Sequence, residues 1–170
     1  GRIKAQSQLA LVVCLFVVIA QFLALTYALH HSQSGVREIS HHHTTTIATI
    51  ERFEDDLTHL SYRILGVVGG IYAAPNIAHE IPRLGDSVFR NFQRVTQELG
   101  ADLDSDITAR ARKAIADLPR FLDRTERLFR QTQPAPTDPE RRRLERHHDE
   151  WLDIRPALTL FAEAVRTRAK

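Results

Sequence analysis

Arginine and tyrosine side chains occur at positions that suit the binding of a small anion. Arg90 and Arg94 are four residues apart and share one face of a helix, whereas Arg63 and Tyr62 adjoin an apolar stripe earlier in the chain. A guanidinium group can donate two parallel hydrogen bonds to a carboxylate or another anion. We therefore name Arg63, Arg90, Arg94 and Tyr62 as candidate ligand-binding residues, with Tyr72 as a further lining residue. The alternative is that these arginines face solvent and that the tyrosines pack beside the core.

Histidine is the second residue type whose spacing could serve chemistry. The chain holds nine histidines among its 170 residues, and they include the clusters His30 with His31, His41 to His43, and His147 with His148. Neutral imidazole is a common ligand of zinc, copper and nickel. On a helix, Asp55 and His59 also lie four residues apart on one face. The candidate ligands of a transition metal are therefore Asp55, His59, His147 and His148.

Two other interpretations of the histidines stay open. The chain lacks the H-E-x-x-H and C-x-x-C patterns that identify zinc sites, so histidines on solvated or membrane-proximal faces are the main alternative. Histidines close to a membrane could also sense pH. Apart from this candidate metal, no cofactor is expected.

Catalysis and nucleic-acid binding find little support in the sequence. There is no glycine-rich phosphate loop and no G-x-S-x-G motif, and the single cysteine, Cys14, lies in an apolar segment. Lys and Arg number 23 against 21 Asp and Glu, so the chain has no strong excess of positive charge. We expect neither an enzyme in this segment nor a nucleic-acid partner.

The elements that must position these residues begin with a membrane segment. Residues 9–29 carry no formal charge, and a helix of this length spans the roughly 30 Å hydrocarbon core of a bilayer. Arg2 and Lys4 precede it, which places the N-terminus in the cytoplasm by the positive-inside rule. We predict a cytoplasmic N-terminus at residues 1–8, a transmembrane helix at 9–29 and an extracytoplasmic domain at 30–170. The alternative is a cleaved signal peptide, whose apolar stretch is usually shorter, about 7–15 residues.

The extracytoplasmic part shows an apolar heptad repeat that predicts a long first helix with a core or dimer seam. No proline or glycine interrupts residues 36–65, so this helix is expected to continue the membrane helix. The seam consists of Ile50, Phe53, Leu57, Leu60, Ile64, Val67 and Ile71.

Three further apolar stripes predict three more helices. The second ends at Gly100, the third contains Pro119, which should kink or break it, and the fourth contains Pro156 and follows a capping box formed by Thr137 and Glu140. The predicted fold is all-α: an N-terminal transmembrane helix that continues into an antiparallel up-down-up-down four-helix bundle.

This layout of a short basic N-terminus, one membrane helix and about 140 residues of heptad-patterned bundle resembles the extracytoplasmic sensor domains of bacterial transmembrane receptors. These are the four-helix-bundle domains of chemoreceptors and sensor histidine kinases. The resemblance implies a homodimer in the bacterial inner membrane whose periplasmic domain binds a small-molecule or ion ligand near the dimer interface. It also implies that a helix displacement carries the signal across the bilayer to cytoplasmic partners. A second membrane helix and an output domain, such as a kinase, are expected after Lys170.

Two other functions fit the same pattern. The chain could be a single-span interaction or structural subunit of a membrane complex, in which case its helical domain docks a protein partner. It could also be a periplasmic metal-binding sensor that uses its histidine clusters. The sensor interpretation predicts small-molecule binding, the subunit interpretation predicts none, and the metal interpretation predicts stabilisation by zinc, copper or nickel.

Overall fold

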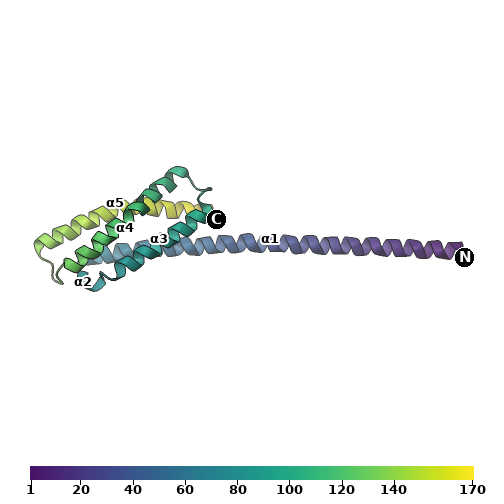
Figure 1. The fold of residues 1–170 in the computed structure, drawn as a ribbon, viewed down its shortest axis with the longest axis horizontal. Coiled ribbons are helices and arrows are strands. Elements are labelled where there is room, and N and C mark those ends of the chain that lie inside the picture. The colour runs from purple at the N-terminus through teal and green to yellow at the C-terminus, as the bar shows by residue number, and fades with distance from the viewer. The chain divides into compact units, whose positions relative to one another are not determined.

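The chain is entirely helical in its computed structural model, which describes the backbone of residues 1–170 and the side chains of residues 1–29 and 44–170. The elements are α1 (Arg2–Val68), α2 (Ala74–Ile77), α3 (Glu80–Leu99), α4 (Ser105–Gln131) and α5 (Asp138–Arg168) (Figure 1). The predicted all-α fold is confirmed. The chain divides into two compact units, Gly1–Thr44 and Thr45–Lys170, which are described separately below.

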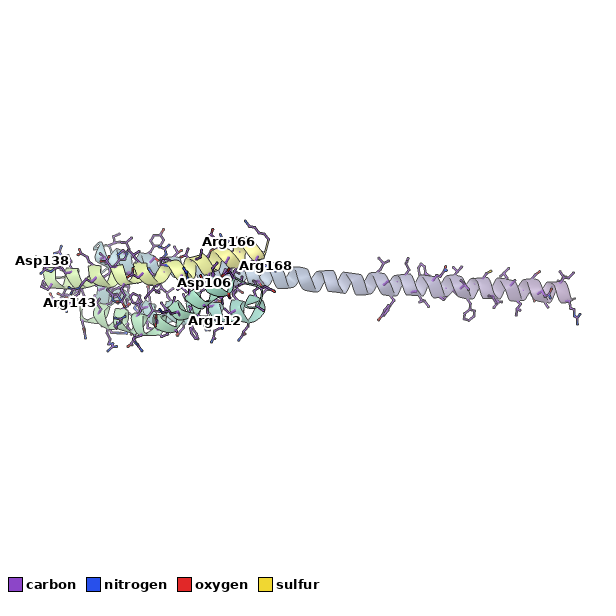
Figure 2. All side chains as sticks on the ribbon, turned by 90° about the horizontal axis from the view of Figure 1, so that it is seen from above. Asp106, Arg112, Asp138, Arg143, Arg166 and Arg168 are labelled. Carbon is purple, nitrogen blue, oxygen red and sulfur yellow. The ribbon has the colours of Figure 1, made fainter. Side chains whose placement is uncertain are left out.

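The first unit holds the apolar segment of α1. Residues Arg2–Leu29 have a mean hydropathy of 2.8 in their most apolar window, in which no side chain is buried within the structure. All of the side chains of residues 1–29 are exposed, and they extend above and below the helix in the view of Figure 2. This segment is therefore a candidate membrane span, and an N-terminal signal sequence can also contain an apolar helix that meets this criterion.

The second unit is a bundle formed by residues 45–68 of α1 with α3, α4 and α5. Along α1 and α3, Thr46 Oγ1 donates to Glu98 Oε2 at 2.8 Å, and Arg63 Nε lies 2.7 Å from Glu80 Oε2. The earlier of these two α1 residues contacts the end of α3, and the later one contacts the start of α3. Helices α1 and α3 are therefore antiparallel.

The remaining helices complete the up-down-up-down order. Trp151 Nε1 donates to Ser61 Oγ at 3.0 Å, and Arg166 pairs with Glu54, so α5 is antiparallel to α1. Arg166 and Arg168 occupy the last turn of α5 (Figure 2). On α4 and α5, Phe121 stacks on Trp151, while Thr125, one turn later, contacts His147, one turn earlier. These two helices are therefore antiparallel as well.

The heptad seam of α1 faces the interior of this bundle. Six of its seven members are at most 3% exposed, and Phe53 packs with Phe92 of α3 and Phe161 of α5 at ring-centre distances of 6.2 and 6.1 Å. Ile71 differs, because α1 ends at Val68 and the chain turns away, which leaves this side chain 77% exposed. The buried members are Ile50, Phe53, Leu57, Leu60, Ile64 and Val67.

The helix ends and prolines follow local sequence rules, apart from the continuation of α4 past Pro119. The capping box of Thr137 and Glu140 is present at the start of α5. Helix α3 begins at Glu80, after a single turn of helix at α2, so Pro82 lies in the first turn of α3. Helix α4 continues past Pro119 to Gln131, so the break that was considered there does not occur.

Candidate functional site

The predicted ligand-binding residues of α1 surround one hollow near the end of this helix. The hollow has a volume of about 420 Å³, and we call it the Arg63 hollow. Tyr62 and Tyr72 both border it, together with Arg63. The complete lining is His59, Tyr62, Arg63, Leu65, Gly66, Ile71 and Tyr72.

Arg63 is held in place by contacts to two other segments of the chain. Its Nε pairs with Glu80 in the first turn of α3, and its guanidinium carbon lies 5.0 Å from the ring centre of Tyr72 in the turn after α1. A cation–π contact at an exposed site contributes about 0.5–1 kcal/mol, and a partly exposed ion pair contributes about as much. The two contacts together orient the guanidinium, while the Arg63 side chain stays 33% exposed.

The ring of Tyr72 can lie against α1 because residue 66 is glycine. A Cβ atom at Gly66 would overlap the Tyr72 ring. The chain returns to this position through Gly70, whose φ of 74° suits glycine. The amides of Gly70 and Ile71 donate to the carbonyls of Val67 and Gly66, which is the Schellman arrangement of a helix C-terminus.

The Arg63 hollow combines hydrogen-bond donors with aromatic surface. The ion pair to Glu80 uses Nε, so the two terminal amino groups of Arg63 supply four further N–H donors. Any anionic ligand would have to compete with Glu80 for the guanidinium, so contact with the tyrosine rings has to contribute to its binding. The hollow therefore favours a small ligand that offers a hydroxyl or carboxylate oxygen and also has an apolar body to contact the tyrosine rings.

The structure does not bring the other two candidate arginines to this hollow. Arg90 and Arg94 are exposed on α3, and neither lines the Arg63 hollow. The fork that they form on one helix face is open to solvent.

The candidate metal ligands are spread over separate positions. Asp55 and His59 are exposed on α1, where His59 borders the Arg63 hollow, while His147 is buried and His148 half-buried in α5. Among the described side chains, no group of three or more His, Cys, Asp or Glu is arranged to hold a metal ion. The remaining clustered histidines lie outside the described side chains: His30, His31 and His41 to His43.

His147 is a packed histidine of the bundle interior. It is 9% exposed, its ring stacks on Phe121 at 4.4 Å, and its Nε2 lies 2.5 Å from Thr125 Oγ1. Since Thr125 Oγ1 donates to the Phe121 carbonyl at 2.9 Å, Nε2 is assigned as the donor to Thr125. Burial lowers the pKa of His147 to about 4; the Glu150 carboxylate opposes this shift and Arg124 adds to it.

A second hollow, which the sequence did not lead us to expect, lies between α3 and α4. It has a volume of about 310 Å³, and we call it the acidic groove because three carboxylates line it. Two unusual residues border it, Gly85 in α3 and Pro119 in α4, and these are the sequence signals that could have pointed to it. Its lining is Pro82, Gly85, Asp86, Phe89, Leu118, Pro119, Leu122, Asp123 and Glu126.

A polar contact between α1 and α3 was also missed. Asp56 accepts hydrogen bonds from Ser87 Oγ at 2.5 Å and from Asn91 Nδ2 at 3.3 Å. The available signal was Asn91, an amide beside the apolar stripe of α3 that is 9% exposed. Because this cluster satisfies its own hydrogen bonds, we assign it to helix register rather than to ligand binding.

Comparison of the chain with protein-family models, with curated proteins and with solved structures found no match. The functional argument therefore depends on the apolar segment, the bundle, the Arg63 hollow and the acidic groove.

Proposed function

We propose that this chain is the membrane-tethered sensor domain of a bacterial signal-transduction receptor, which binds a small molecule and passes a helix displacement across the membrane. The observation that carries the proposal is the Glu54–Arg166 ion pair, which shows that the C-terminal end of α5 lies beside the part of α1 that enters the bundle. A ligand that displaces α1 within the bundle would therefore act on the helix that continues directly into the apolar segment.

The proposed topology places the N-terminus in the cytoplasm and the bundle in the periplasm. Its basis is the pair Arg2 and Lys4 ahead of the apolar segment. In this proposal the Arg63 hollow is the ligand site and the bundle performs no catalysis. The output is delivered to cytoplasmic signalling partners.

The experiment for this proposal is a small-molecule thermal-shift screen on the full chain in lipid nanodiscs. We expect at least one hydroxyl- or carboxylate-bearing compound to raise the melting temperature of the bundle, and the Arg63→Gln variant to lose this rise. Arg90→Gln is the matched control, because Arg90 is exposed and outside the hollow. A library that leaves the melting temperature unchanged would count against a sensor. A rise that survives in Arg63→Gln would remove the hollow from the proposal.

A homodimer is part of the sensor proposal, and the burial pattern suggests which surface it would use. Leu57 and Ile64 are buried in the core of the bundle and so cannot contact a second copy. Tyr62 and Leu65 of α1, in contrast, are 64% and 50% exposed. A second copy would therefore dock on the outer face of α1. We expect Leu65→Glu to reduce dimerisation in sedimentation analysis while the thermal unfolding of the bundle stays intact. A monomeric full chain at high concentration would contradict this part of the proposal.

A second candidate function is a membrane-anchored interaction subunit. It is favoured by the exposed apolar side chains Tyr62, Leu65 and Ile71, which would suit contact with a protein partner. This function predicts that Ile71→Glu and Leu65→Glu weaken a membrane complex isolated with the chain, and that no small molecule changes the stability of the bundle.

A further inference from the structure

We propose that the acidic groove between α3 and α4 binds a small organic cation, an ammonium ion attached to an apolar body such as a single ring. This site is distinct from the Arg63 hollow. The proposal therefore goes beyond the sensor function, and the two proposals are tested independently of each other.

The shape of the groove depends on a close approach of two helices. A Cβ atom at Gly85 would overlap Leu122 of α4, so glycine at this position lets α3 approach the side chain of Leu122. Leu118 and Leu122 are buried members of the lining, and Phe89 at its edge is 38% exposed. The volume of about 310 Å³ is at the lower end of the range of about 300–1,000 Å³ that ligand sites occupy, which suits a small ligand.

The charges at the groove have one sign. The lining includes the carboxylates of Asp86, Asp123 and Glu126 and no Arg or Lys side chain. Among the described residues, the structure records no ion pair for Asp86. A cation in the groove would therefore meet one carboxylate without a recorded ion pair and two others close by.

Two of the carboxylates already contact arginines, but these contacts are external to the groove. Asp123 pairs with Arg127 at 2.6 Å and Glu126 pairs with Arg130 at 2.8 Å, each one helical turn further along α4. Neither arginine lines the groove. Exposed pairs of this kind contribute about 0–1 kcal/mol, so a bound ammonium could share these carboxylates at little cost.

One further feature favours a cation over an anion. Phe89 offers a partly exposed aromatic ring, whose face attracts a cation. The polar groups that the groove offers are thus acceptors, which an ammonium can use and a carboxylate cannot.

The test titrates three probes of similar size into the full chain in lipid nanodiscs, with the leucine methyl groups labelled for NMR. The probes are phenethylammonium, the neutral 2-phenylethanol and the anionic 3-phenylpropionate. We expect phenethylammonium to shift the methyl signals of Leu118 and Leu122 in a saturable manner, and we expect the other two probes to bind at least tenfold more weakly. Empty nanodiscs measure how much of each probe enters the lipid.

Matched variants then locate the site. Asp86→Asn should weaken phenethylammonium binding at least fivefold, whereas Asp117→Asn, an exposed position of α4 outside the groove, should leave it unchanged. The proposal is overturned if phenethylammonium shifts no methyl signal, if 2-phenylethanol binds equally well, or if Asp86→Asn binds like the unmodified chain. None of these outcomes bears on the Arg63 hollow, so they leave the sensor proposal to its own test.

Discussion

At the scale of single residues, His147 shows how burial changes the chemistry of a side chain. The sequence places it in a histidine pair next to acidic residues, which suggested a metal ligand. In the bundle its ring instead stacks on Phe121 and bonds to Thr125, while its Nδ1 lies 3.9 Å from the Glu150 carboxylate. This environment favours the neutral imidazole, because protonation would place a charge in a largely apolar layer.

The stability of the bundle should therefore depend on pH through His147. Its pKa is near 6.5 when unfolded and about 4 when folded, so its contribution is complete above pH 6.5 and is lost as the pH falls toward 4. The full pKa difference corresponds to about 3 kcal/mol, and we expect about 2 kcal/mol because Arg124, which also lowers this pKa, is half exposed and screened by solvent. Urea unfolding of the full chain, followed by circular dichroism between pH 7 and pH 4, measures this loss.

A variant pair separates His147 from the carboxylates that also titrate in this range. His147→Gln keeps an amide that can bond to Thr125 but does not titrate. The free energy of unfolding of this variant should therefore change less between pH 6.5 and pH 5 than that of the unmodified chain. His59→Gln, at an exposed position, should leave this pH dependence unchanged. If His147→Gln has the same pH dependence of unfolding free energy as the unmodified chain, His147 does not cause the loss of stability.

The residue types of the Arg63 hollow could be predicted from the sequence, but its contacts could not. Arg63 and Tyr62 are neighbours in the chain, and their position beside the seam follows from the heptad repeat. The contacts to Glu80 and Tyr72 depend on the path of the turn after α1, which is set by a positive φ at Gly70. Sequence periodicity describes which face of a helix is apolar, and it carries no information on such a path.

At the scale of elements, the end of α1 controls the Arg63 hollow. Gly70 adopts a φ of 74°, and replacing it with alanine forces a side chain into the left-handed region at a cost of about 1–2 kcal/mol. We expect Gly70→Ala to destabilise the bundle by about that amount and to weaken any ligand of the Arg63 hollow. Thermal unfolding and the thermal-shift assay measure the two effects.

Gly69→Ala is the control for this prediction. Gly69 adjoins Gly70 but has no positive φ, and a Cβ atom there would meet only the Leu65 carbonyl at 3.3 Å. Its effect should be clearly smaller than that of Gly70→Ala. Equal effects of the two substitutions would contradict the role given to the Schellman turn.

The two helix-interior prolines provide a second prediction at this scale. Pro119 and Pro156 each remove a backbone hydrogen bond from a helix that nevertheless continues past them. Replacing either with alanine should stabilise the chain by about 1 kcal/mol, part of the roughly 3 kcal/mol that proline costs an unadapted helix. Only Pro119→Ala should also weaken binding in the acidic groove, because Pro156 lies outside it. Identical binding by both variants would show that Pro119 does not shape the groove.

The elements themselves were largely predictable, and the exceptions have local causes. The seam of α1 and the capping box of α5 follow from residue spacing alone. Helix α2 is a single turn, which is too short for any periodic pattern, and Pro75 lies at its start. The acidic groove was missed because it forms where Gly85 of α3 meets Leu122 of α4, and the sequence of one helix does not specify its partner.

At the scale of the whole molecule, the two units of the chain expose different kinds of surface. The bundle buries its apolar side chains internally, whereas Arg2–Leu29 exposes nearly all of its own. Exposed apolar surface on this scale is stable only in a bilayer or against a partner. The composition fits both a permanent anchor and a signal sequence, and the two differ in whether this segment stays attached.

We expect the segment to remain attached as an anchor. The chain should then stay in the membrane fraction through alkaline carbonate extraction and keep an intact mass consistent with 19.4 kDa plus any tag. Val17→Arg puts a charge near the middle of the span at a cost of about 2.5–3.5 kcal/mol and should reduce membrane retention. Leu160→Arg, at an exposed position of α5, should not. A soluble product that has lost the mass of the apolar segment would identify a signal sequence instead. This outcome would also contradict the helix-displacement proposal, because a released bundle has no membrane helix through which to pass a signal.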